Sequence, residues 1–283
     1  MKRFLTMIFT LCALAFSLGA QSFVRLDIGE EALVRINPAA ASAEAGGKAW
    51  AAGKYTVCSD ELYAEDPLDI SVGAVIPFKW GKIGVEAAHD AYSFFDRHDL
   101  SLTYSKGWKV GKSGILAVGG GVSLAFDNVD YGRLVVPSRE EGRVLYCLPD
   151  VNLGFEYAGR HIRTGIAVRN LFSSRSAQTA SPRFFSAYFG YRFGLAAERL
   201  GLTPYVLAGY SEAIFASVGG RVDWDRKYEI GYSLDQQQAR HVVNAACRVP
   251  LAADGLSLKV MGAWSCALFS DFQTFSVGFG VGF

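Results

Sequence analysis

The sequence predicts an all-β protein that folds as a transmembrane antiparallel β-barrel of about 14 strands. The first observation is the segment Thr274–Phe283, where odd positions are large and apolar and even positions are small or weakly polar. A period of two gives a strand one apolar face and one polar face. The second observation is that this pattern recurs along the chain in segments of about ten residues, close to the ~9–11 that cross a bilayer at the usual tilt. The third is that short and long connections alternate between these segments.

The first seven strands are expected where apolar residues occupy every second position. In the second strand, for example, Ile70, Val72 and Ile76 share one face. In the third strand, Lys82 and Glu86 lie on the face opposite its apolar residues. The seven ranges are Lys48–Val57, Asp69–Phe78, Lys82–Asp90, Asp99–Ser105, Leu116–Phe126, Val151–Tyr157 and Ile162–Val168.

The last seven strands follow the same rule. Phe185, Phe189 and Phe193 lie on one face of the eighth strand, opposite Ser186 and Gly190. An even number of strands is expected when both termini of the chain lie on the same side of the membrane. The seven ranges are Phe185–Phe193, Leu202–Tyr210, Ile214–Trp224, Tyr228–Leu234, His241–Val249, Leu256–Trp264 and Phe272–Phe283.

The N-terminal segment predicts export. Lys2 and Arg3 form a short positive head, and Phe4–Phe16 is an apolar core followed by small residues. Residues 1–20 are therefore expected to be a cleaved signal peptide, because the apolar run is shorter than the ~20 residues of a spanning helix. A final strand that ends on an aromatic residue, here Phe283, resembles the last strand of bacterial outer-membrane barrels. The expected localisation is the bacterial outer membrane.

Charges and tryptophans agree with a lipid-facing exterior. Charge on the lipid face costs ~2–4 kcal/mol at the midplane, so charged residues are expected on the lumen side. The charged residues on the less apolar phase are Glu156, Arg163, Arg169, Arg192, Arg221, Asp223, Lys227, Glu229 and Lys259. Tryptophans near strand ends are typical of an interfacial belt, and those expected to form one are Trp50, Trp80, Trp108, Trp224 and Trp264.

Residues 21–47 lack the two-residue period and form a separate N-terminal segment, before a barrel of residues 48–283. Asn37–Ser42, with the sequence N-P-A-A-A-S, is its most distinctive part. The segment is expected either to plug the barrel mouth or to extend into the periplasm, and the sequence does not decide between these alternatives.

Composition and motifs argue against an enzyme or a nucleic-acid-binding protein. The net charge of +1 gives no reason to expect nucleic acid as a partner. No CxxC or other metal spacing joins Cys58, Cys147, Cys247 and Cys266, so no metal or cofactor is expected. Catalysis by a nucleophile needs a base within hydrogen-bond reach, and nothing in the sequence places a serine beside His89 or His98 with that constraint. We expect no catalytic residues.

Several motifs, in this order, resemble the PorP/SprF family of outer-membrane proteins of the type IX secretion and gliding machinery of Bacteroidetes. Asn37–Ser42 is similar to an early N-P-A element of that family, and Pro149–Tyr157 is similar to its P-D-x-x-x-G-x-x-Y strand. Further similar segments are Gly84–Asp90, Leu116–Leu134, Ile166–Leu171, Tyr188–Phe193 and Ile230–Asp235.

This resemblance implies a non-enzymatic component that assists the export or surface attachment of cargo proteins. Outer-membrane lipid, periplasmic ring components and secreted cargo are the partners that it implies. The partner-binding surface is expected in the outer loop Asn128–Leu148, whose charged residues are Arg133, Arg139, Glu140, Glu141 and Arg143; a solvated loop is the alternative. The other functional hypothesis is a FadL-like, PorV-like or porin-like channel for small molecules.

Overall fold

The computed structural model describes residues 31–43, 46–57, 68–92, 95–130, 142–173, 182–211, 213–235, 239–251, 256–267 and 273–283. Its helices are α2 (Glu31–Ile36) and α3 (Ala40–Ala43). Its strands are β1 (Lys48–Val57), β2 (Leu68–Phe78), β3 (Gly81–Tyr92), β4 (Phe95–Val110), β5 (Gly114–Asp130), β6 (Arg143–Ala158), β7 (Ile162–Arg169), β8 (Phe184–Tyr191), β9 (Phe193–Leu195), β10 (Leu200–Ser211), β11 (Ala213–Trp224), β12 (Tyr228–Asp235), β13 (Arg240–Pro250), β14 (Ser257–Ala267) and β15 (Gln273–Gly282).

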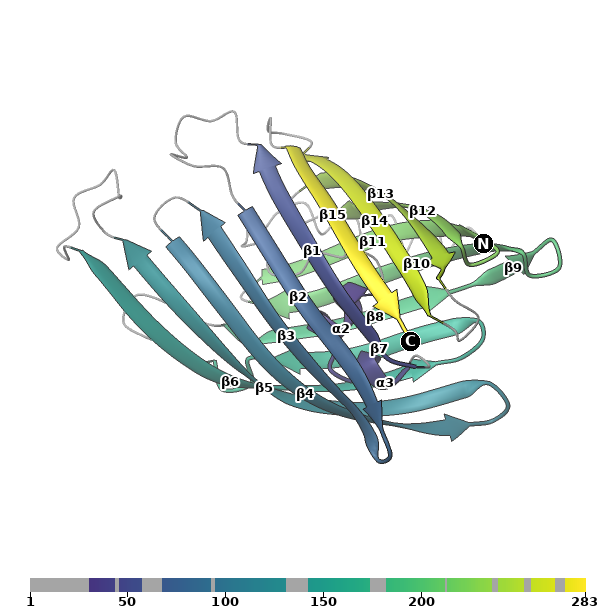
Figure 1. The fold of residues 1–283 in the computed structure, drawn as a ribbon, viewed down its shortest axis with the longest axis horizontal. Helices are drawn as coiled ribbons and strands as arrows, with labels where there is room; N and C mark the ends of the chain where they lie inside the picture. Colours follow the sequence, from purple (N-terminus) through teal and green to yellow (C-terminus); the bar gives the residue numbers. More distant parts are fainter. Residues whose placement is uncertain are drawn as a thin grey trace.

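These strands form one closed antiparallel barrel, which Figure 1 shows as a tilted ring of ribbons. Each wall strand pairs with its neighbours in sequence, and β15 pairs with β1, from Gly282 opposite Lys48 to Gln273 opposite Val57. Both β8 and β9 pair with β10, so they are two parts of one wall strand that is divided at Arg192. Counted in this way, the described residues form a barrel of 14 strands, and the predicted number is confirmed.

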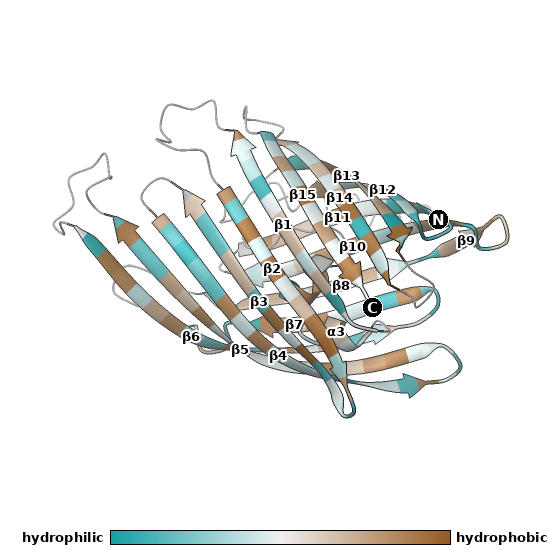
Figure 2. Cartoon of the chain, in the orientation of Figure 1, coloured by the Kyte–Doolittle hydropathy of each residue, from teal (hydrophilic) through white to brown (hydrophobic). Residues whose placement is uncertain are grey.

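Side chains alternate between the outside of the barrel and its lumen, as the period of two predicts. In β15, Val277 and Phe279 are 52% and 51% exposed, whereas Thr274 and Ser276 are 1% and 4% exposed. Figure 2 shows the resulting alternation of hydrophobic and hydrophilic residues along the strands. The outer surface is therefore apolar and suited to lipid.

The two ends of the barrel differ in their connections. We call the end that carries residues 79–80, 111–113, 159–161, 196–199, 225–227 and 251–256 the turn end; β1 begins there and β15 ends there. The opposite loop end carries the three longest connections, residues 58–67, 131–142 and 170–183. Short connections are typical of the periplasmic side of such barrels, which places the turn end towards the periplasm.

Three neighbouring strands extend furthest beyond their predicted ranges. β4, β5 and β6 have 16, 17 and 16 residues, and their pairing continues as far as Asp130 opposite Arg143. The predicted outer loop Asn128–Leu148 is wrong at its edges, because β5 continues to Asp130 and β6 begins at Arg143. The strand pairing continues although both faces carry polar residues there.

One predicted belt residue points the other way. Trp50 is 7% exposed and lies in the lumen, whereas Trp80, Trp108 and Trp224 are exposed near the turn end. The indole of Trp50 fits against Gly73 of β2, where an added Cβ would lie 2.2 Å from the ring. The belt interpretation is therefore wrong for Trp50, since this side chain packs inside the barrel.

The helical segment lies within the ring of strands, and in Figure 1 α2 and α3 lie behind β1, β2 and β3. The α3 helix contacts β3, β4, β5 and β6. A buried cluster joins Leu33, Ile36 and Ala40 to inward-facing wall residues such as Val75 and Leu207. Among the described residues, no helix is both long and apolar enough to cross a membrane. The core of this molecule is thus inside the barrel, around α2 and α3.

Candidate functional site

The turn that joins α2 to α3 is the most deeply buried part of the helical segment. We call Asn37–Ala39 the anchor turn; Asn37 and Ala39 are fully buried. Pro38 lacks an N–H and disfavours a helical conformation at Asn37, so α2 ends before it. The Asn37 side chain then stabilises the turn, because its Oδ1 accepts a hydrogen bond from the Ala39 backbone N–H at 3.0 Å.

Glycines in β5, β6 and β7 allow the anchor turn to pack closely against the barrel wall. A Cβ added at Gly154 would lie 1.9 Å from Asn37 Oδ1, and one at Gly165 would lie 2.7 Å from Asn37 Nδ2. A Cβ at Gly119 would lie 2.5 Å from the Ala39 nitrogen. We call Gly119, Gly154 and Gly165 the wall glycines, because each permits an approach that any side chain would block.

A chain of polar contacts leads from the anchor turn into the wall. Asn37 Nδ2 donates to the Phe155 carbonyl at 2.9 Å and to Tyr188 Oη at 3.3 Å. The Tyr188 hydroxyl donates to the carboxylate of Glu156, which also accepts from Arg163 Nε at 2.7 Å. The Glu156 side chain is fully buried, so its charge depends on both donors. The anchor turn is therefore held by hydrogen bonds as well as by shape.

The sequence predicted only parts of this arrangement. It placed Glu156 and Arg163 on the lumen face, and the structure confirms both positions. It did not connect them to Asn37, and it missed Tyr188. The alternation of β8 could have indicated that Tyr188 faces the lumen, because Phe185 and Phe189 lie on the outer face and Tyr188 lies on the inner one.

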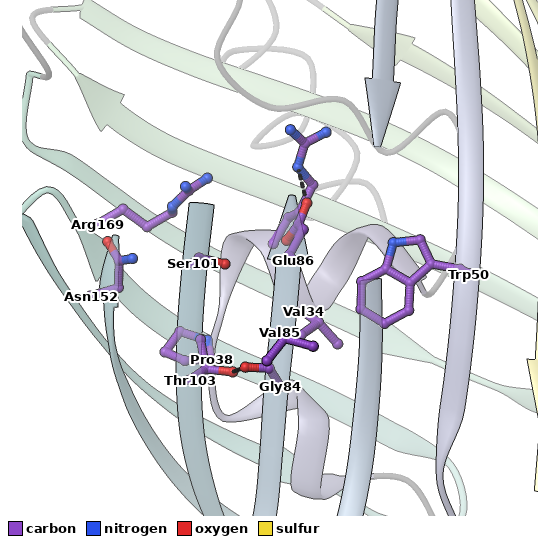
Figure 3. Close-up of a pocket in the computed structure, with 11 residues that line it drawn as sticks. Val34, Pro38, Trp50, Gly84, Val85, Glu86, Ser101, Thr103, Asn152 and Arg169 are labelled. Carbon is purple, nitrogen blue, oxygen red and sulfur yellow. Dashed lines mark hydrogen bonds and ion pairs between the residues drawn. The ribbon is translucent and has the colours of Figure 1, made fainter. Parts of the chain in front are cut away.

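On the loop-end side of the anchor turn, α2 is fixed by an ion pair. Arg35 Nε lies 2.7 Å from Glu86 Oε1, and the Glu86 side chain is 11% exposed. Figure 3 shows Glu86, Arg169 and Trp50 around a small cavity beside Pro38. Its volume of about 20 Å³ has room for about one water molecule. This cavity is too small to admit a larger ligand.

Arg35 lies in a strongly acidic environment. Burial lowers the pKa of Arg35, but the nearby carboxylates outweigh burial and the pKa is raised above its ordinary value. Those carboxylates belong to Glu86, Asp69, Asp90 and Asp99. Arg35 is thus firmly protonated, and its charge ties α2 to β3.

A larger cavity lies at the turn end, which we call the turn-end vestibule. It has a volume of about 440 Å³ and is lined by β6–β8, β10–β14 and the turns between them, together with Leu33 and Ala43 of the helical segment. Arg192 Nη2 lies 2.9 Å from Asp223 Oδ1, and Lys259 Nζ lies 3.3 Å from Glu229 Oε2. A volume of this size falls in the range of ligand-binding pockets.

Of the predicted partner-binding residues, the structure describes Arg143, which lies at the loop end and not at this site. Arg133, Arg139, Glu140 and Glu141 lie outside the described residues. Arg143 is the first residue of β6, where its Nε lies 3.1 Å from Asp130 Oδ2 and its side chain is 63% exposed. An ion pair this exposed contributes little to stability, so Arg143 is available at the loop-end rim.

Side chains that could bind a metal ion lie apart from one another in the described part of the chain. Within the described ranges, no group of three or more His, Cys, Asp or Glu residues is placed to hold a metal ion. Cys147, Cys247 and Cys266 are free thiols, and Cys58 lies outside the described residues. His89 and His98 stack on one another with ring centroids 4.5 Å apart. The geometry of the lumen is that of an anchored internal segment with a vestibule beneath it.

Comparison with known proteins identifies the family. The family model described as "Type IX secretion system membrane protein PorP/SprF" matches residues 36–283. The match begins at the last residue of α2, so it includes the anchor turn and the whole barrel. No curated protein matches the chain by sequence.

Solved structures with a similar fold are outer-membrane barrels. A Pseudomonas aeruginosa FadL homologue has a TM-score of 0.55 at 10% identity, over 88% of this chain and 92% of that one. The CymD monoaromatic hydrocarbon channel has a TM-score of 0.54 at 11% identity, over 90% of this chain and 92% of that one. At this identity the likeness concerns the fold alone.

Proposed function

Because the chain belongs to the PorP/SprF family of type IX secretion system membrane proteins, we propose that it assists the export or surface attachment of cargo proteins from the outer membrane. Its partners are then periplasmic components of the secretion machinery and the secreted cargo, with outer-membrane lipid around the barrel. The role is non-enzymatic. Residues 1–20 are the signal peptide, residues 21–47 the plug and residues 48–283 the barrel.

The buried anchor turn is the observation that carries this proposal. Asn37 and Ala39 are fully buried against the wall glycines, and Arg35 is ion-paired to β3. A segment fixed in this way obstructs the lumen, so a component that works beside cargo fits better than an open pore. Exposed charges at the loop-end rim, of which Arg143 is one, offer a surface for cargo at the cell exterior.

The proposal is tested by deleting the gene in the bacterium that encodes it. We expect specific proteins to disappear from the cell surface and culture medium, measured by surface biotinylation and quantitative mass spectrometry, and to return on complementation. The abundance of other outer-membrane barrels serves as the control. Unchanged export of every surface protein in the deletion strain would refute the role.

A small-molecule channel is the second candidate, and the turn-end vestibule favours it. A cavity of about 440 Å³ beneath the helical segment is large enough for a small ligand. Planar bilayer recordings separate the two functions. Steady single-channel conductance of the wild-type barrel supports the channel, whereas near silence supports the obstructed secretion component.

A further inference from the structure

The turn-end vestibule has an unusual excess of positive charge. Six cationic side chains line it, and they come from four different strands or the turns beside them: Arg160, Arg163, Arg192, Arg221, Arg226 and Lys259. Clefts lined by one sign of charge concentrate oppositely charged ligands. The vestibule opens at the turn end, which the connection lengths place on the periplasmic side.

The carboxylates around the vestibule do not balance these cations. Glu156 pairs with Arg163, Asp223 pairs with Arg192, and Glu198 is shared by Arg160 and Arg192. Glu229 is likewise shared, at 3.8 Å from Arg221 and 3.3 Å from Lys259. Among the described residues, four carboxylates thus face six cations, and this part of the lining has a net positive charge.

The unbalanced charge lies where a ligand can reach it. Arg226 is exposed in the turn between β11 and β12, and it has no ion-pair partner among the described residues. Arg160 is 58% exposed in the turn between β6 and β7. Both turns border the opening of the vestibule, so these two arginines form its cationic rim.

The floor of the vestibule is different from its rim. Leu33, Leu207 and Met261 give it an apolar base, formed partly by the helical segment. Thr203 adds a buried hydroxyl that has no hydrogen-bond partner within the described residues. An apolar base below a cationic rim fits a polypeptide that carries both carboxylates and apolar groups, better than it fits a small inorganic anion.

We propose that the turn-end vestibule binds a carboxylate-rich polypeptide segment presented from the periplasm. Arg160 and Arg226 make the first contacts with its carboxylates, and apolar side chains of the segment rest on Leu207 and Met261. Charge complementarity of this kind speeds encounter and suppresses basic partners. The inference goes beyond the secretion role and is tested on the purified barrel, so either can fail without the other.

The test uses the purified barrel in detergent and a fluorescein-labelled peptide that alternates glutamate and leucine, with binding followed by fluorescence anisotropy. We expect saturable binding that weakens as salt rises. The double variant Arg160→Gln, Arg226→Gln is expected to raise Kd about fivefold or more. Both residues lie in exposed turns, and glutamine keeps a polar side chain there while removing the charge.

The matched control is the double variant Lys79→Gln, Lys112→Gln. These lysines are exposed in turn-end turns outside the vestibule, so the control removes the same charge from the same end of the barrel. Its Kd is expected to equal that of the wild type. An equal loss of affinity in both double variants, or no saturable binding, overturns the proposal. Competition by inorganic phosphate as effective as that by unlabelled peptide would show a small-anion site instead, and would also overturn it.

Discussion

Replacing Gly154 with alanine tests whether the wall glycines hold the anchor turn in place. The added Cβ would lie 1.9 Å from Asn37 Oδ1 and 3.1 Å from Pro38 Cδ. Neither atom can move far, because Asn37 is fully buried and Pro38 is fixed in the turn. We therefore expect Gly154→Ala to displace the anchor turn from the wall.

The size of the effect follows from the contacts of Asn37. Its side chain makes hydrogen bonds of 2.9 Å to Phe155, 3.3 Å to Tyr188 and 3.0 Å to Ala39. The bond to Ala39 lies within the anchor turn and moves with it, so displacement from the wall removes the other two. Each contributes about 0.5–1.5 kcal/mol net, so losing both costs about 1–3 kcal/mol. Since 1.4 kcal/mol is a factor of ten in equilibrium, release of the segment should become about fivefold to a hundredfold more favourable.

Limited proteolysis measures this release. Trypsin cuts after arginine, and the Arg35–Ile36 bond is protected in the folded barrel, where Ile36 is fully buried. Cleavage there requires local opening, so its rate follows the opening equilibrium. In Gly154→Ala we expect cleavage after Arg35 to accelerate by the factor above, detected by mass spectrometry.

The matched control is Gly280→Ala. Gly280 also faces the lumen, but a Cβ there would meet its nearest atom at an ordinary 3.7 Å. Cleavage after Arg35 in this variant should occur at the wild-type rate. If Gly154→Ala and Gly280→Ala were cleaved equally fast, the wall glycines would not be what holds the anchor turn, and the reasoning would be refuted.

Three further changes test other parts of the structure. Tyr188→Phe removes a hydroxyl donor from the buried Glu156 carboxylate, and we expect about 1–3 kcal/mol of destabilisation, seen as a lower temperature of barrel unfolding on semi-native gels. Arg35→Met leaves the Glu86 carboxylate without its ion-pair partner. We expect this single variant to be less stable than the double variant Arg35→Met, Glu86→Gln, because the double variant also removes the uncompensated charge of Glu86. Equal stability of the two variants would contradict this expectation. Deleting Phe283 removes two backbone hydrogen bonds that close the barrel beside β1, and we expect less folded protein in the outer-membrane fraction, measured by immunoblotting.

The barrel itself could be predicted because lipid imposes a strict rule on its strands. Val277 and Phe279 face outward and Ser276 faces inward because one face must be apolar. Beyond the lipid this rule no longer applies. Asp130 opposite Arg143 is part of a regular strand pair, yet both residues are polar, so the period of two gave no signal and a loop was predicted instead. The error at Trp50 has a different cause, because its position near a strand end does not reveal which face a tryptophan occupies.

The position of the helical segment could not be predicted, because the residues that hold it lie in distant parts of the chain. Residues 31–43 have no periodic pattern that indicates which strands they contact. Gly119, Gly154 and Gly165 each look like ordinary glycines in a strand. Their common role depends on register, since Gly119 lies directly opposite Gly154 in the β5–β6 pair. That pairing aligns two glycines in one row and opens a recess for Asn37 and Pro38.

Glycines on the inner face of the barrel wall therefore occur for more than one reason. Gly280 belongs to the alternating C-terminal strand, and the space beside it would accept a methyl group. Gly154 belongs to a strand with the same alternation, but its side-chain position is occupied by Asn37. Alternation alone cannot separate these cases, because it records which face a residue occupies and not what lies against that face. At Gly154 the crowding is between the wall and the helical segment, whereas at Gly73 it is between two wall strands, because Trp50 of β1 fills the space.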